Sequence, residues 1–214
     1  MEMKTIIYVL YFCLLINCKP NNQFLIKTNN DYLECKNKFP KRLVEYLPTK
    51  LTNTYCSYVC SEVVSRNDVG LKVNNYNVDI SEIDSIATYL QSKSIAKYSS
   101  NDTCLLIVNR FETLDSYENR EDIIIKDSVK IERDCYKNLY PVPNFIEFRN
   151  HSAKELNIGP DFDIYVLEAK SGNYFKEYNL KPNPQMPNNW KNGYSKGVAL
   201  SREENTVIYW AIVW

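Results

Sequence analysis

The stretch NTVIYWAIVW, residues 205–214, carries apolar side chains at odd and even positions alike. A strand with one face in solvent alternates apolar and polar residues, whereas a strand covered on both faces is apolar throughout. The stretch therefore predicts a central strand, with a layer packed on each face of its sheet. The mostly apolar residues 196–201 precede it across residues 202–204, which predicts a β-hairpin.

Four other runs predict strands, because β-branched and aromatic residues dominate them or the run is compactly apolar. They are residues 54–64 (TYCSYVCSEVV), 69–78 (VGLKVNNYNV), 103–109 (TCLLIVN) and 162–169 (FDIYVLEA). A turn near Asn67 and Asp68 is expected to join the first two. Residues 182–192 (PNPQMPNNWKN) carry three prolines and predict a long loop before the hairpin.

Residues 81–97 predict the clearest helix. Its apolar side chains recur at the spacing of one helical face, at Ile83, Ile86, Ala87 and Leu90. Asp79 and Glu82 have the spacing of a capping box at its start. Residues 31–51 predict a shorter helical segment. The fold class is therefore α+β, with a mainly antiparallel sheet, one amphipathic helix packed on it and a C-terminal β-hairpin.

Residues 1–17 have the pattern of a secretion signal. Residues 5–16 (TIIYVLYFCLLI) form an apolar run that is shorter than the about 20 residues needed to span a bilayer. Cleavage by the ordinary signal peptidase requires small residues one and three places before the cut, and this region has none. That alternative would give a secreted glycoprotein with acceptor sites at Asn101 and Asn150.

Residues 15–18 (LINC) resemble the lipobox of bacterial lipoproteins, with Asn17 where a smaller residue is usual. The resemblance implies that the leader is cut before Cys18 and that the Cys18 thiol receives a diacylglycerol group. Two or more acyl chains, palmitate among them, hold a protein stably on a membrane. Residues 18–31 are then expected to form a lipidated polar tether, and residues 32–214 a single globular α+β domain.

The C-terminal third carries a second resemblance. Residues 163–175 (DIYVLEAKSGNYF) and 186–214 (MPNNWKNGYSKGVALSREENTVIYWAIVW) resemble small lipoproteins of Bacteroidota bacteria. The resemblance implies a double-membrane cell envelope and brings no activity. Surface-exposed lipoproteins of that group tend to carry acidic residues after the cysteine, and residues 19–23 (KPNNQ) have none. We therefore expect an anchor in the periplasm-facing leaflet of the outer membrane.

An odd number of cysteines remains when the leader residue Cys13 and the lipid acceptor Cys18 are set aside. They are Cys35, Cys56, Cys60, Cys104 and Cys135. In an oxidising compartment at most two disulfides can form, and one thiol is left over. Spacing does not fix the pairing, except that Cys56 and Cys60 in one strand would lie about 13 Å apart, too far to bridge each other.

Charge and composition argue against several classes of function. The 26 basic and 26 acidic residues cancel, so no overall field favours nucleic acid as a partner. The single histidine, His151, has polar neighbours, and Asp161 and Asp163 lack the ligand-rich loop of a calcium site. We therefore expect no metal and no cofactor.

One set of motifs supports an enzymatic alternative. Ser94 and Lys97, then residues 117–119 (YEN) and 170–172 (KSG), follow the order of the three motifs of penicillin-binding proteins and serine β-lactamases. The pattern implies serine acyl transfer, with Ser94 acylated and Lys97 activating it. The intervals are shorter than that fold usually requires, and Ser94 lies late in its predicted helix rather than at a helix start.

The interpretation that we favour is a non-enzymatic binding module. Its expected partners are the bilayer, through Cys18, and a protein or envelope component, which includes an immunity-type protein that guards against a toxin. Trp190 and Tyr194, at the end of the proline-rich loop, are the expected ligand contacts, because long ordered loops are disproportionately functional. The alternative is that Trp190 pins this loop to the core.

Overall fold

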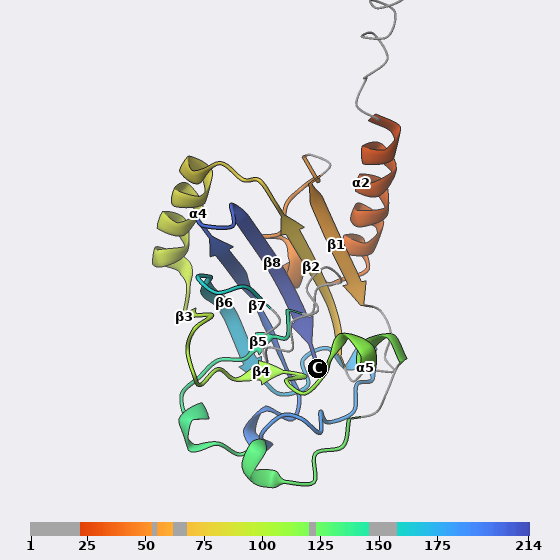
Figure 1. Cartoon of the computed structure of the whole chain (residues 1–214). Helices are drawn as coiled ribbons and strands as arrows, with labels where there is room; N and C mark the ends of the chain where they lie inside the picture. The colour runs from red at the N-terminus through yellow and green to blue at the C-terminus, as the bar shows by residue number, and fades with distance from the viewer. Residues whose placement is uncertain (1–21, 53–54, 62–67, 120–122, 146–157) are drawn as a thin grey trace, which may run out of the picture.

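A computed structural model shows the arrangement of the chain (Figure 1). The structure describes residues 22–52, 55–61, 68–119, 123–145 and 158–214. The predicted leader, Cys18 and His151 lie outside these ranges. Within them, no helix has both the length and the apolar character needed to cross a membrane.

A six-stranded antiparallel sheet forms the centre of the molecule, in the strand order β1-β2-β8-β7-β6-β3 (Figure 1). Its strands are β1 (Cys56–Ser61), β2 (Val69–Asn75), β3 (Ala96–Ser99), β6 (Asp163–Ser171), β7 (Gly193–Ser201) and β8 (Thr206–Val213). β7 and β8 form the predicted hairpin, in which Ser201 pairs with Thr206. The predicted α+β class, antiparallel sheet and C-terminal hairpin are confirmed.

Strand β8 is buried on both faces, as its continuous apolar pattern predicts. Val207 and Val213 face the layer of helices, whereas Ile208, Trp210 and Ile212 face the opposite layer. The strand lies between β2 and β7, so both of its edges are hydrogen-bonded. This central position explains why apolar residues occur at every register position of the strand.

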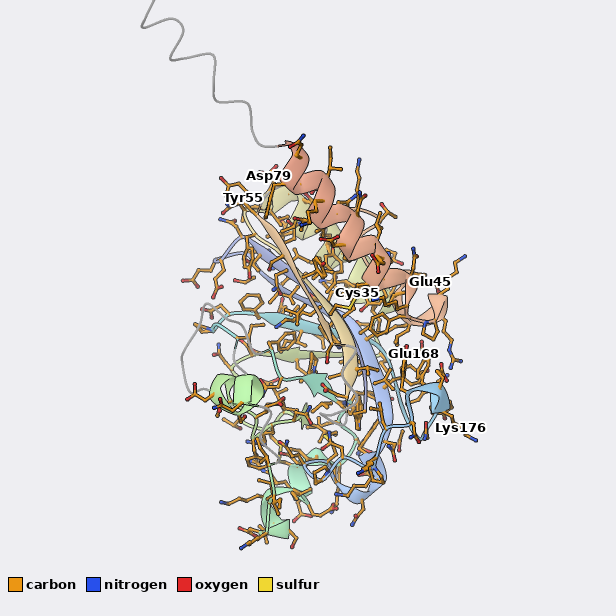
Figure 2. The ribbon with its side chains drawn as sticks, turned by 90° about the vertical axis from the view of Figure 1, so that its right-hand side faces the viewer. Cys35, Glu45, Tyr55, Asp79, Glu168 and Lys176 are labelled. Carbon is orange, nitrogen blue, oxygen red and sulfur yellow. A yellow bond between two sulfur atoms is a disulfide. The ribbon has the colours of Figure 1, made fainter. Side chains whose placement is uncertain are left out.

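The helices cover one face of the sheet. They are α2 (Asn22–Asn37), α3 (Lys41–Val44) and α4 (Ile80–Lys93). The short 3-10 helix η4 (Lys176–Tyr178) lies in the same layer. Figure 2 looks at the β1 side of the molecule, with α2 on one face of the sheet and α5 on the other. The predicted helical face of α4 is confirmed, because Ile83, Ala87 and Leu90 are buried against β6, β7 and β8.

Mostly irregular backbone covers the other face. Its short elements are β4 (Ile107–Val108), α5 (Leu114–Asn119), η2 (Ser128–Lys130), η3 (Asp134–Tyr136), β5 (Val142–Pro143) and η5 (Asn188–Trp190). β4 and β5 pair in parallel and form a separate two-stranded sheet. The strand predicted over residues 103–109 is thus reduced to two residues, although the run is buried as expected.

Part of the expected tether is helical in the structure, because α2 already begins at Asn22. The second half of α2 is held to the rest of the chain: Tyr32 Oη donates to Pro48 O at 2.6 Å, and Lys36 Nζ donates to Leu47 O at 2.8 Å. Once these turns are fixed, each further residue at the N-terminal side adds a hydrogen bond without a new nucleation cost. Packing of the second half of α2 therefore extends the helix into its largely exposed first turns.

The helix predicted over residues 81–97 ends at Lys93 instead. Ser94 already has extended backbone angles, and Ile95 N–H donates to Val166 O at 2.8 Å. The following residues pair with β6 as strand β3. Pairing with an open sheet edge overrides the local helical preference here.

The structure forms two disulfides, which is the maximum that the cysteine count allows. Cys35 in α2 is bonded to Cys60 in β1, and Cys104 is bonded to Cys135. Cys56 takes part in neither and donates its S–H to Asn75 Oδ1 at 3.1 Å. The first bridge fastens the N-terminal helix to a strand at the edge of the sheet.

Candidate functional site

The structure places the two predicted ligand contacts on opposite faces of the sheet. Trp190 belongs to the core under the irregular layer, and its side chain is 8% exposed. The ring centroids of Trp190 and Trp214 lie 6.0 Å apart, and Trp214 Nε1 donates to the backbone oxygen of Trp190 at 2.7 Å. These contacts fasten the proline-rich loop to the end of β8. Trp190 therefore has the structural role that the sequence analysis gave as its alternative.

Tyr194 lies on the helix side, in a half-buried cluster of charges. Its hydroxyl donates to Glu168 Oε1 at 2.5 Å. Lys170 Nζ lies 3.2 Å from the same oxygen, and Lys196 Nζ lies 3.1 Å from Glu168 Oε2. Lys196 Nζ also donates to the backbone oxygen of Arg42 at 2.6 Å. Figure 2 shows Glu168 on the side of the sheet that carries α2 and α3.

The electrostatics of this cluster indicate a structural role. Partial burial acts to raise the pKa of Glu168, but hydrogen bonds from Tyr194, Lys196 and Lys170 outweigh it and lower the pKa to about 2. Burial and the neighbouring carboxylate raise the pKa of Tyr194. A general acid or base needs a pKa near the working pH, which neither group has. The cluster therefore fastens α3 to the sheet.

Ser94 and Lys97, the pair of the acyl-transfer alternative, lie in different elements. Ser94 caps the C-terminus of α4, whereas Lys97 lies in β3 with its Nζ 3.0 Å from Asp163 Oδ2. The hydrogen bond to the Asp163 carboxylate raises the pKa of Lys97. A lysine that activates a serine requires a lowered pKa. The surroundings of Lys97 thus give this alternative no support.

The two carboxylates considered for calcium lie in different backbone settings. Asp161 lies in a turn with a φ of 66°, and Asp163 opens β6 and pairs with Lys97. Across the described ranges, no three His, Cys, Asp or Glu side chains are grouped as a metal site. Asp163 thus forms an ion pair with the edge strand β3 and has no calcium-binding loop around it.

Strand β1 offers a different kind of site, because it forms one edge of the sheet. Its sequence, CSYVCS, contains neither charge nor proline. Edge strands in soluble proteins usually carry lysines, prolines or bulges that block pairing with another chain. The other edge strand, β3, is shorter and carries Lys97. Among the described residues, β1 itself therefore carries no charge or proline that would block pairing at this edge.

The backbone of Tyr58, in the middle of β1, points away from β2. Just before the strand, Tyr76 N–H donates to Tyr55 O at 3.4 Å, which marks these two residues as a hydrogen-bonded pair. Such pairs alternate with non-hydrogen-bonded pairs along an antiparallel ladder. The register pairs Tyr58 with Val73, three places farther on. This pair is therefore not hydrogen-bonded, and the N–H and C=O of Tyr58 face outward.

A groove lies beside this edge, on the face opposite the helices. We call it the edge groove; it is lined by Val59 and Ser61 of β1, by β2 and β8, and by a wall that contains Val108 and Pro143. Trp210 and Ile212 contribute apolar floor. Its cavity volume is about 80 Å³, far below the roughly 300–1,000 Å³ of pockets that take small molecules. The groove therefore suits a side chain of a larger partner.

The rim of the edge groove carries charges of both signs. Asp68 and Lys72 contribute from the sheet side, and Glu112 from the opposite wall. A polar rim around an apolar floor is the usual anatomy of a protein interface. The composition thus favours a peptide segment with an apolar anchor over a strongly charged ligand.

Asparagine side chains hold the wall of the edge groove in place. Asn144 Nδ2 donates to the backbone oxygens of Asn109 and Glu112, at 2.9 and 3.0 Å. Asn109 has a φ of 56°, a left-handed conformation that asparagine tolerates better than most residues. Asn183, which is fully buried, donates its Nδ2 to Asn109 Oδ1 at 2.7 Å. The wall is therefore preformed.

Sequence reasoning missed this site, although part of its signal is visible. The uncharged run at residues 56–61 predicts a strand, but its position at an edge depends on long-range pairing that the sequence does not show. The wall is built from residues far apart in the chain, such as Asn109 and Asn183.

Comparisons with protein-family models, with curated proteins and with solved structures found no match.

Proposed function

We propose that the protein is a membrane-anchored envelope lipoprotein that binds a protein partner by strand addition at β1. The observation that carries the proposal is the uncharged edge strand, with the N–H and C=O of Tyr58 directed outward. In strand addition, backbone hydrogen bonds supply affinity, and pockets for alternate side chains supply specificity. A toxin that meets an immunity-type protein is one partner of this class.

The edge groove lies where an added strand would need it. Residues directly opposite each other in a sheet direct their side chains to the same face. Val59 and Ser61 line the edge groove, so partner residues opposite them would direct their side chains into it. Tyr58 faces the helix side, where its ring packs on Tyr32 at 5.7 Å. Specificity would therefore come from the groove side of the added strand.

A second copy of the chain is a poorer occupant of this edge than a different protein. Two antiparallel copies of β1 would be related by a twofold axis perpendicular to the sheet. That axis would turn the N-terminal ends of the two α2 helices, which lie near Tyr55 in Figure 2, in opposite directions. Both copies could not then be anchored in the same membrane through Cys18.

The membrane anchor is tested by labelling with radioactive palmitate in a bacterium that processes lipoproteins. The full chain is expected to take up label, and the Cys18→Ala variant is expected to take up none and to leave the membrane fraction. Persistent label in Cys18→Ala would contradict the anchor without bearing on strand addition.

Strand addition is tested with a photoreactive amino acid at Ser61, on the groove side of β1. Irradiation in the native cell is expected to give one discrete adduct with a partner. Tyr58→Pro removes the outward N–H and keeps the pairing with β2, because proline is tolerated at edge positions whose N–H faces solvent. We expect Tyr58→Pro to reduce the adduct at least about tenfold.

The matched control is Tyr58→Ala, which loses the same ring but keeps the outward N–H. This variant is expected to retain most of the adduct, and circular dichroism checks that both variants are folded. Equal adducts in Tyr58→Pro and Tyr58→Ala would contradict strand addition. An adduct with twice the mass of the chain would replace the foreign partner with a second copy.

A further inference from the structure

We infer that the first turns of α2 lie in the headgroup layer of the membrane that holds the protein, an inference that rests on the proposed anchor at Cys18. The two ends of this helix differ in their surroundings. Tyr32 and Cys35, toward its C-terminal end, are 0% and 4% exposed. Phe24 and Ile26, in its first turns, are 61% and 59% exposed.

The geometry of the helix favours a lipid surface over a protein as the cover for these side chains. Successive residues are turned by about 100°, so Phe24 and Ile26, two positions apart, point to nearly opposite sides of α2. A protein partner would cover one side of the helix. The boundary between headgroups and acyl chains surrounds a helix end that enters it, and it accepts aromatic and aliphatic side chains on every side.

The length of chain before α2 places its first turns at the membrane. Cys18 is separated from Asn22 by three residues, which span at most about 14 Å between the two Cα atoms. Phe24 lies about 3 Å farther along the helix axis. A lipidated Cys18 is held at the membrane surface, so the exposed apolar residues follow within reach of the headgroup layer.

The charges of this segment agree with a lipid surface. Residues 19–30 (KPNNQFLIKTNN) contain two lysines and no acidic residue. The first acidic side chain of α2 is Asp31, after more than two helical turns. The N-terminus of a helix also carries a partial positive charge. The segment is therefore not repelled by the phosphates of the lipid headgroups.

The inference orients the rest of the molecule. Tyr55, directly before β1, lies at the same end as the N-terminus of α2 (Figure 2). β1 runs from this end toward Ser61, about 20 Å away at strand spacing. Ser61 lines the edge groove, so this part of the groove lies away from the end of the molecule that would face the bilayer.

Tryptophan fluorescence in vesicles tests the inference. The lipidated Phe24→Trp protein is placed in vesicles of phosphatidylethanolamine and phosphatidylglycerol, with or without bromine atoms near the headgroup end of the acyl chains. The native Trp190, Trp210 and Trp214 are at most 8% exposed, and the parent protein supplies their signal for subtraction. We expect the added emission to shift to shorter wavelength and to fall about twofold with the brominated lipids.

The matched control is Ile124→Trp, at a site that is 77% exposed and four residues before η2. η2 lies at the end of the molecule away from α2 (Figure 1), so its added emission is expected to be unchanged by bromine. An anchored protein whose Phe24→Trp emission is no more quenched than that of Ile124→Trp would overturn this inference alone. A protein without an acyl group at Cys18 that does not float with the vesicles would overturn both the inference and the anchor.

Discussion

At the scale of single residues, Trp214 is the side chain on which the end of β8 depends most. It is 1% exposed, and its backbone N–H and C=O both pair with Gly193 at 2.9 Å. Trp214→Ala is expected to lower the free energy of unfolding by about 3–5 kcal/mol, because it removes a large buried side chain and leaves a cavity. Urea denaturation measures the change.

The control for Trp214→Ala is Tyr89→Ala, in the exposed part of α4, where the tyrosine is 60% exposed. A surface substitution of this kind is expected to change stability by no more than about 0.5 kcal/mol. Equal effects of the two substitutions would show that the end of β8 contributes little to the core.

Glu168 makes stability depend on acid pH. Its pKa is about 2 in the folded protein, against an ordinary value of 4.5. A group with a lowered folded-state pKa contributes stability above its unfolded-state pKa, and the contribution is lost as the pH falls through the folded-state value. The stability difference between the parent and Glu168→Gln is therefore expected to shrink as the pH falls from about 4.5 to 2. A difference that stays constant over this range would contradict the charge cluster.

Single residues also show where sequence reasoning succeeds and where it stops. The five cysteines that remain after Cys13 and Cys18 are set aside allow at most two disulfides and leave one thiol over, and the described residues contain two disulfides and the thiol of Cys56. The partners depend on which strand lies next to α2, which is a long-range property. In the same way, Tyr194 is recognisable as an aromatic residue near a loop, but its bond to Glu168 depends on the register of β6 against β7.

At the scale of elements, the bond between Cys35 and Cys60 ties α2 to β1. Replacing both residues with alanine is expected to cost about 3 kcal/mol of stability, from the closure entropy of a loop of this length. It should also expose the amides of α2 to faster hydrogen exchange while those of β7 and β8 stay protected. Hydrogen exchange followed by mass spectrometry measures both regions.

The matched variant for α2 replaces Cys104 and Cys135, which close a loop of similar size in the irregular layer. It is expected to lose a similar amount of stability and to leave the protection of α2 unchanged. Equal loss of protection in α2 for both variants would show that the first disulfide has no local role.

Whole elements were predicted most accurately where the local pattern and the tertiary contacts agree. The hairpin of β7 and β8 and the apolar face of α4 are of this kind. The local sequence pattern predicts the secondary structure less accurately where tertiary contacts determine the backbone conformation. Residues 22–31 were expected to be a tether, yet they are helical because the end of α2 is packed. Residues 96–99 leave a helical pattern to pair with β6.

At the scale of the whole molecule, one strand joins two cores. The core under the helices includes Leu71, and the core under the irregular layer includes Phe145; β8 contributes side chains to both. With the disulfides intact, we expect a single cooperative unfolding transition that Leu71→Ala and Phe145→Ala both shift to lower urea concentration. Non-coincident transitions by circular dichroism and tryptophan fluorescence would show that the two layers unfold independently.

The place of β8 in the order of the sheet also has a consequence for how the chain matures. β1 and β2 lie on one side of it and β7, β6 and β3 on the other, yet β8 follows all of them in sequence. The two parts of the sheet can join only after the ribosome has made β8 and, in the exported lipoprotein that we propose, only after this strand has crossed the inner membrane. Until then the central pairing of the sheet is incomplete. In the proposed lipoprotein this pairing would be completed in the compartment where the disulfides form.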